Sequence, residues 1–363
     1  MSTDKADILV SIIIPAYNAA RFLRFTLESV ISQSYDNLEI LVIDDGSTDN
    51  TVEIASSYAI KDDRITILKQ ENKGVAAARN RGIECSKGLF IAFVDADDIW
   101  HPTAVVKMLN CFKRSSSELA VVYAWSLDID YNNVPTVGVP VSRARGYVYA
   151  LLLCHNFLGN ASSTMIRAAH LKSLYGYRTE FNIGCEDWDL YLRLAKKFHY
   201  EFIPEFLVAY RKFPESMSSN TAKMNRSHTQ VIDKLRAEYP SIPPLLLRLS
   251  KINFYAYLAH TTAPDQAGPN SFYWIRKSVK TNILLSLLRF DFVYLILSRL
   301  WCADFLHNKR DNSGRMRRSI FEGIQDGKFS SSFSPPRPIY LIVTLKNFLG
   351  SVMLFLLRRL TCL

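Results

Sequence analysis

The sequence of 363 residues predicts an α/β protein with a mostly parallel sheet flanked by helices and a helical C-terminal appendage. Three observations support this fold class. Short apolar runs alternate with helical patterns over the first hundred residues, and the links between them are short. The first run, Ile8–Ile14, is continuous and rich in β-branched residues, as strands buried on both faces are. Beyond residue 220 the pattern becomes helical.

The individual elements are expected in the following order. Strands are predicted at 8–14, 38–43, 65–68, 89–94, 120–129, 163–166 and 202–211. Helices are predicted at 19–32, 51–58, 73–85, 102–112 and 187–197. Pro102 suits the first turn of its helix, whereas Pro204 is expected to break the strand at 202–211.

Positive charge is concentrated in the last third of the chain. Residues 1–250 contain 28 Lys and Arg against 28 Asp and Glu, and residues 251–363 contain 16 against 6. The whole net charge of +10 therefore comes from the second part. We expect one domain at 1–220 and a basic helical region at 221–363, which could face anionic lipid, nucleic acid or an acidic partner.

Two long apolar segments, 283–301 and 339–357, lie in this basic region. The second is interrupted by Lys346 and Asn347, and a central lysine is costly in a spanning helix of about 20 residues. A helix in the membrane interface tolerates such residues on its polar face. We therefore expect peripheral membrane contact through 221–363, with 339–357 as the membrane-associated segment. A buried helical bundle, a dimer interface and a true span remain alternatives.

The sequence also predicts the cellular compartment and makes some partners and metal sites unexpected. The polar start MSTDKAD does not resemble a signal peptide, so we expect a cytoplasmic protein, peripheral at the cytoplasmic face of the membrane. The six cysteines form no C-x-x-C pair and predict neither a zinc site nor a disulfide framework. Nucleic acid is not expected as a partner, because no zinc knuckle or RNP-like stretch occurs and the basic residues are interleaved with Leu, Ile and Phe.

Polar side chains follow three of the predicted strands, in the loops at 15–18, 44–50 and 95–98. In an open parallel sheet these ends form the crevice where ligands bind. Each loop alone could be an ordinary turn or helix cap. Asp95, Asp97 and Asp98 are the most unusual, because three neighbouring carboxylates repel one another and are costly to bury unpaired. Either they end the strand in water or a cation binds among them.

Two further segments carry charged residues in helical patterns. Arg79 lies at helical spacing from Val75, and a buried arginine there would need a carboxylate or phosphate partner, whereas an exposed one would form a surface salt bridge. Glu186, Asp187 and Asp189 are expected in the first turn of a helix, where the helix dipole favours acids.

Taken together, these segments resemble the family 2 glycosyltransferases, nucleotide-sugar-dependent enzymes of the GT-A fold. The resemblance covers about residues 8–215 and depends on five motifs in a fixed order. These are "SIIIPAYN", "LEILVIDDGSTDNT", "NKGVAAARNRGI", "FIAFVDADDIWHP" and "EDWDLYLRL". Any one of them would be a weak signal, but five in order are a strong one.

The resemblance implies a nucleotide site at the first two strand ends. Tyr17 would border the base, Asp45 with Asp44 would accept from the base edge, and Arg79 would lie near the base and the phosphates. The full implied set is Pro15, Ala16, Tyr17, Asn18, Asp44, Asp45, Arg79 and Asp95.

The resemblance also implies a metal site and a catalytic base. Asp97, with Asp95 beside it, would bind Mn²⁺ or Mg²⁺, which suit oxygen ligands. Asp187 would be the base that deprotonates the acceptor hydroxyl, with Glu186 as the second choice. Four more residues have less defined roles. Asp98 would hold the loop or contact the sugar, and Trp188 would line the sugar or acceptor pocket unless it is a buried structural residue. Arg211 and Ser216 would contact the diphosphate.

The function implied is an inverting, metal-assisted transfer of a sugar from a nucleotide sugar, expected to be UDP-linked, to a hydroxyl of a glycan or lipid-linked acceptor. Cell-surface polysaccharide or glycolipid biosynthesis would be its setting. A nucleotidyltransferase-like enzyme on a similar fold is one alternative, although "PAYNAARF" lacks the glycines of a phosphate loop. A non-catalytic nucleotide-sugar-binding protein is the other.

Overall fold

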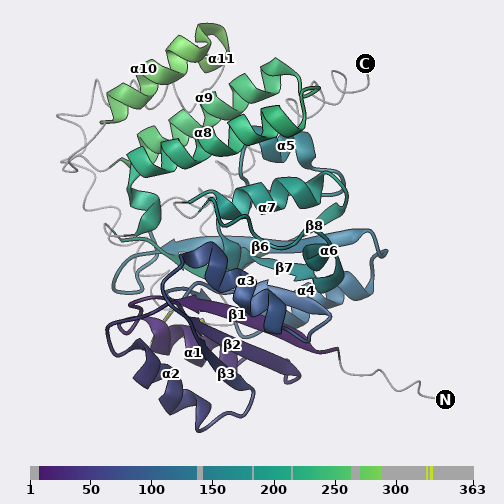
Figure 1. Cartoon of the computed structure of the whole chain (residues 1–363), viewed down its shortest axis with the longest axis vertical. Coiled ribbons are helices and arrows are strands. Elements are labelled where there is room, and N and C mark those ends of the chain that lie inside the picture. The colour runs from purple at the N-terminus through teal and green to yellow at the C-terminus, as the bar shows by residue number, and fades with distance from the viewer. Residues whose placement is uncertain are drawn as a thin grey trace.

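The computed structural model describes residues 8–136, 142–181, 184–213, 216–262, 270–287, 324–325 and 328–329. An eight-stranded sheet in the order β3-β2-β1-β4-β7-β6-β8-β5 forms its centre (Figure 1). The strands are β1 Val10–Ala16, β2 Leu38–Asp44, β3 Ile65–Lys69, β4 Phe90–Phe93, β5 Ile99–Trp100, β6 Leu119–Ile129, β7 Thr164–Arg167 and β8 His199–Arg211. A separate antiparallel pair joins β9 Ile324–Gln325 to β10 Lys328–Phe329.

The helices confirm the alternating order predicted for the first hundred residues. They are α1 Leu23–Ile31, α2 Thr51–Ala59, α3 Val75–Cys85, α4 Ala104–Lys113, α5 Tyr149–Cys154, α6 Ala168–Ser173, α7 Glu186–Ala195, α8 Thr221–Glu238, α9 Pro244–Thr261, α10 Ser271–Thr281 and α11 Ile283–Leu287.

The sheet has a parallel half and a mixed half. β1 pairs in parallel with β2 and β4, and β2 pairs in parallel with β3. β7 then runs antiparallel between β4 and β6, whereas β6 and β8 are parallel and the short β5 is antiparallel to β8. The α/β fold class is confirmed, with the parallel strands gathered around β1.

Both faces of the sheet are covered, as the continuous apolar strands predicted. Ile12 and Ile14 of β1 belong to a core that includes α1, α2 and α4, whereas Ile13 belongs to the core on the other face with α3, α5 and α7. This division follows from the alternation of side chains along a strand. All three isoleucines are fully buried.

The strand β8 is continuous through Pro204, contrary to the predicted break. Its pairing with β6 shifts register between Ala124 and Trp125, which face Ile203 and Phe206. Pro204 and Glu205 lie in this irregularity, where the missing N–H of proline is not needed for the ladder.

The C-terminal helices form further layers on the α7 side of the sheet (Figure 1). Val231, Ile232 and Leu235 of α8 are buried in the same core as α5 and α7, so the helical region begins as part of that core. Farther out, α10 packs on α9 around Trp274 and Ile275. Within the described ranges, no helix has the length and apolar character needed to cross a membrane. The predicted segment 339–357, and residues 288–301 of the other, lie outside the described residues.

Candidate active site

The loops after β1 and β2 are joined into one surface. Asn18 adopts a left-handed backbone conformation, with φ of 48°. Its N–H donates to Ser47 Oγ at 3.0 Å, and its side-chain oxygen accepts from the Thr48 N–H at 2.8 Å. Asn18 therefore connects the two loops. Tyr17 beside it is 52% exposed and could receive a flat ligand on its ring. Pro15 and Ala16 are strand residues paired with Ile43 and Asp44.

The adjacent carboxylates Asp44 and Asp45 differ in their partners. Asp45 uses both oxygens inside the chain, accepting from Gln70 Nε2 at 2.7 Å and from the N–H groups of Lys73 and Gly74 at 2.9 and 2.8 Å. It thereby holds the start of α3. Among the described residues, the Asp44 carboxylate accepts one hydrogen bond, from the Ser47 N–H at 3.2 Å. Between these two acids, Asp44 has more capacity to accept from a ligand.

The acidic loop after β4 separates its three carboxylates into different environments. Asp98 is fully buried and structural, because it accepts from Ser162 Oγ and from the Arg211 N–H at 2.9 Å. Ser162 Oγ also accepts from the Asp95 N–H at 3.0 Å. Asp98 thus holds the loop, one of its two predicted roles. The importance of Ser162 could not be predicted, because it lies 64 residues from Asp98 and belongs to no motif.

Among the three acids of this loop, Asp97 has the fewest partners for its carboxylate charge within the described residues. Its carboxylate accepts no hydrogen bond from another side chain within the part of the chain that the structure describes. Burial and the neighbouring Asp95 charge raise the pKa of Asp97 to about 7, against the opposing effect of Arg211. A carboxylate held in this way has both the capacity and the energetic need for a cation.

Arg79 connects this loop to the second acidic cluster. It is buried and donates from Nη2 to Asp95 Oδ1 at 2.6 Å and from Nη1 to Glu186 Oε1 at 2.7 Å. Burial opposes its charge, but the ion pairs outweigh that effect and raise the pKa of Arg79 well above its usual value. Its approach depends on Gly82, since a Cβ there would lie 2.4 Å from Ile13 Cγ2 and would push α3 away from β1.

The first turn of α7 presents Glu186 and Asp187 differently. Glu186 is buried in its ion pair with Arg79, and its other oxygen, Oε2, has no partner among the described residues. Asp187 is less buried and accepts from the Trp188 N–H at 2.6 Å through Oδ1. Burial and the Glu186 charge raise the pKa of Asp187 to about 7, with Arg79 lowering it. Asp187 therefore has the better access and a basicity near neutral pH.

Trp188 and Arg211, which were both predicted to contact substrate, are buried in the structure. Trp188 is buried, donates to the Leu152 carbonyl at 2.9 Å and stacks on His228, so it is the structural residue that was the alternative prediction. Arg211 is also buried and uses Nε, Nη1 and Nη2 to hold neighbouring loops. These contacts use three of its five N–H donors, and burial limits access to the other two. A contact between Arg211 and a diphosphate stays a prediction.

Ser216 lies five residues after the end of β8. It lies at the start of a 3₁₀ turn, and its hydroxyl donates to the Phe213 carbonyl at 2.7 Å. A contact between Ser216 and a diphosphate remains a prediction.

The acidic loop fits a divalent cation that takes most of its ligands from elsewhere. Within the described residues, no group of three or more His, Cys, Asp or Glu side chains is arranged to hold a metal ion. Asp97 and the second oxygen of Asp95 would supply one or two carboxylate ligands. Mg²⁺ typically binds in this way, with phosphate oxygens and water completing its shell.

Residues 11–149 match the family model described as Glycosyl transferase family 2. The chain carries a family 2 glycosyltransferase domain. Four of the five motifs fall within this match, and the fifth, at residues 186–194, follows it. The matched residues include the loops after β1, β2 and β4, and also Arg79 of α3. Helix α7, with Glu186 and Asp187, lies beyond the matched residues.

Two curated relatives of this domain have names that indicate enzymes of glycan synthesis or glycosyl transfer. The chain is 28% identical to a chondroitin synthase of Escherichia coli over 62% of its length and 32% of that protein. It is 52% identical to an uncharacterized glycosyltransferase, YibD, of Escherichia coli K12 over 31% of its length and 32% of that protein. The chain spans about a third of these relatives' own length.

Solved structures support the GT-A fold of the domain. The mannosyltransferase PcManGT from Pyrobaculum calidifontis superposes with a TM-score of 0.52, covering 82% of this chain and 88% of that one at 15% identity. TarS of S. aureus superposes with a TM-score of 0.50 over 77% of this chain and 55% of that one, at 16% identity.

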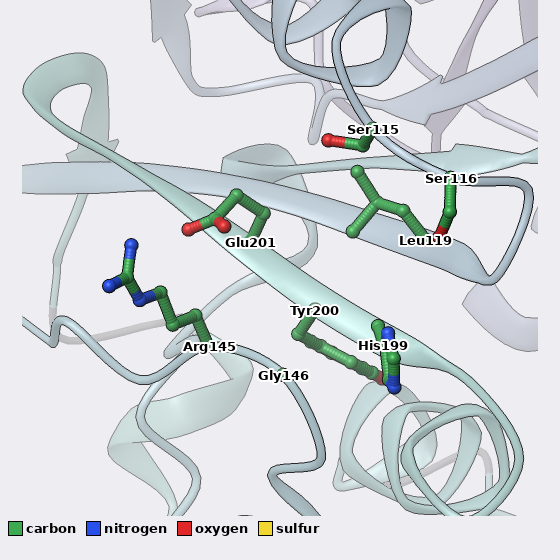
Figure 2. A pocket seen from close by; sticks show the side chains of 8 residues that line it. All are labelled: Ser115, Ser116, Leu119, Arg145, Gly146, His199, Tyr200 and Glu201. Carbon is green, nitrogen blue, oxygen red and sulfur yellow. The ribbon is translucent and has the colours of Figure 1, made fainter.

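A cavity of about 380 Å³ lies away from this site (Figure 2). It is lined by residues at the starts of β6 and β8, including Leu119, His199 and Glu201, together with Arg145. The acidic loop is bonded to Arg211 at the opposite end of β8. No predicted site residue lines this cavity, so it plays no part in the site at the strand ends.

Proposed function

We propose that this chain is an inverting glycosyltransferase that moves a sugar from a nucleotide sugar, UDP-linked, to a hydroxyl of a glycan or lipid-linked acceptor. The observation that carries the proposal is the meeting of two acidic clusters at one arginine. Asp95 of the metal-binding candidate loop and Glu186 beside the candidate base both pair with Arg79.

The donor would occupy the crevice formed by the loops after β1, β2 and β4. Tyr17 would stack on the base, and Asp44 would accept a hydrogen bond from its edge. A nucleotide-sugar donor is further supported by the mannosyltransferase PcManGT, which was solved with GDP-Man and Mn²⁺.

The diphosphate would lie beside Asp95 and Asp97. An Mn²⁺ or Mg²⁺ ion bound there would stabilise the charge of the leaving diphosphate as a Lewis acid. The chain's own contribution is to position the two carboxylates. Asp98, Ser162 and Arg211 fix the loop that carries them.

Asp187 would act as general base. It would accept the proton of the acceptor hydroxyl while that oxygen attacks the anomeric carbon from the face opposite the diphosphate, so that one displacement inverts the centre. A pKa near the operating pH favours this role. Glu186 is less suited, because its carboxylate is buried and committed to Arg79.

The proposed setting is cell-surface polysaccharide or glycolipid biosynthesis at the cytoplasmic face of the membrane. The basic region 221–363 supports contact with such a surface. The name of the relative chondroitin synthase is consistent with a glycan product.

A donor screen tests this function. UDP-, GDP- and dTDP-sugars are offered to the full chain with and without Mn²⁺, and binding and donor hydrolysis are measured. We expect metal-dependent binding of at least one nucleotide sugar, and a product anomer opposite to the donor anomer by NMR once an acceptor is found. Absence of any metal-dependent nucleotide binding would overturn the proposal.

A further inference from the structure

Helix α10 carries a stripe of exposed aromatic and basic side chains, Phe272, Tyr273, Arg276 and Lys280, which we name the α10 stripe. Phe272 and Tyr273 are 50% and 43% exposed, and Arg276 and Lys280 are exposed as well. Phe272, Arg276 and Lys280 follow one another at intervals of four residues, which places them on one side of the helix, with Tyr273 beside them.

The opposite side of α10 is firmly attached to the molecule. Trp274, Ile275 and Ser278 are buried, and Trp274 and Ile275 pack on residues of α9. The helix begins at a regular cap, in which the Asn270 side chain accepts from the Tyr273 N–H at 3.0 Å. In Figure 1, α10 lies on the outer side of α9, farthest from the sheet. The stripe therefore faces away from the protein's own core.

The charge of this helix pair has one sign. Neither 244–261 nor 271–281 contains an Asp or Glu, whereas together they hold Arg248, Lys251, Arg276, Lys277 and Lys280. The Lys277 Nζ lies 5.1 Å from the centre of the Tyr273 ring and 5.6 Å from that of Trp274. Lys277 thus lies close to two aromatic rings of its own helix, of which Tyr273 is exposed and Trp274 is buried.

We propose that the α10 stripe docks this protein on an anionic lipid surface. Basic side chains are attracted to anionic headgroups, and aromatic side chains partition into the interface between headgroups and acyl chains. A single-stranded nucleic acid would also use cations and rings, but it usually lies in a groove. Here both kinds of side chain project from the outside of one helix.

Sedimentation with vesicles tests the proposal on the full chain. The vesicles are phosphatidylcholine alone or phosphatidylcholine with phosphatidylglycerol, at low and high NaCl. We expect binding to the anionic vesicles only, weakened by salt. This assay needs no sugar donor, so its result is independent of the proposed transfer reaction.

Variants locate the contact. Arg276→Gln with Lys280→Gln should weaken binding by about 25-fold, since each cation near the surface contributes about a fivefold factor. Phe272→Ser with Tyr273→Ser should also weaken it. All four side chains are exposed, so folding should be preserved, as circular dichroism melting can verify. Ile60→Ser with Lys61→Gln is the matched control, because both side chains are exposed and directly follow α2. Helix α2 lies on the opposite side of the molecule from α10 (Figure 1).

Four results would overturn the proposal. The unchanged chain could fail to pellet with anionic vesicles. If it bound single-stranded RNA instead, the stripe would be a nucleic-acid contact. It could bind neutral vesicles equally well. The α10 variants could bind as strongly as the unchanged chain, which would place the contact elsewhere in 221–363. Sedimentation equilibrium could show that the variants dissociate a dimer, which would make the stripe a contact between two copies.

Discussion

Arg79 Nη1 lies 2.7 Å from Glu186 Oε1, and this contact joins residues that are 107 positions apart in the chain. The arginine side chain is 4% exposed and that of Glu186 is 8% exposed, so water screens their attraction little. The same guanidinium holds Asp95 at 2.6 Å. Through these two bonds Arg79 fixes the acidic loop after β4 relative to the first turn of α7.

Replacement of Arg79 should therefore destabilise the fold. Arg79→Gln leaves Glu186 and Asp95 without their counter-charge, and loss of one partner of a buried pair costs about 3–5 kcal/mol. Urea unfolding measures the change. Arg81→Gln is a matched control two positions away, because the Arg81 side chain is 51% exposed and lies 3.7 Å from Glu84. The control should change stability by no more than about 0.5 kcal/mol. Equal effects of the two substitutions would contradict the bridging role.

Neighbouring acids of the loop after β4 should respond in opposite ways to amide substitution. The pKa of Asp97 is raised, so stability from its protonated form is present below its usual pKa and is lost as the pH rises through about 7. At pH about 8, Asp97→Asn should leave the metal-free melting temperature unchanged or higher, and should abolish the increase that Mn²⁺ with nucleotide produces. Burial also raises the pKa of Asp98, but Asp98→Asn should lower the melting temperature, because an amide keeps only one of the two oxygens that accept buried hydrogen bonds. A metal-dependent increase that survives Asp97→Asn would contradict the assignment.

The rate of transfer should depend on pH through Asp187. Burial and the Glu186 charge raise the pKa of Asp187 to about 7, and only its deprotonated form can accept a proton. With donor and Mn²⁺ held saturating, kcat should rise with pH up to about 7 and then level off. A kcat that is constant from about pH 5 to about pH 8 would show that no carboxylate with a raised pKa limits the reaction.

The parallel half of the sheet could be predicted because its signals are local. The run 8–14 contains no polar residue except Ser11. Ser11 can be buried because its hydroxyl donates a hydrogen bond to Glu39. The loops that follow the strands could be placed together by topology alone, because parallel strands present their carboxyl ends at one edge. The acidic loop and the "PAYN" loop were accordingly predicted at the correct edge of the sheet.

The roles of individual polar residues could not be predicted in the same way. The burial of Trp188 and Arg211 could not be predicted, because the stack of Trp188 on His228 and the hydrogen bond of Arg211 to the Asp97 carbonyl are tertiary contacts. A buried Arg79 was predicted to need a carboxylate or phosphate partner, but the sequence could not identify its two partners, which are carboxylates 16 and 107 residues away. Sequence spacing gives the type of side chain at a site, and packing decides which of its atoms remain free.

The catalytic role of Asp187 is tested most directly by Asp187→Asn, with donor affinity and kcat measured on the same preparation. The substitution removes the proton acceptor but keeps the size and the Oδ1 contact to the Trp188 N–H. Donor Kd should change little, while kcat should fall by about 10²–10⁴-fold. Glu186→Gln should instead lower stability by breaking the pair with Arg79. Full transfer activity in Asp187→Asn would contradict this account and would move the base elsewhere, first to Glu186.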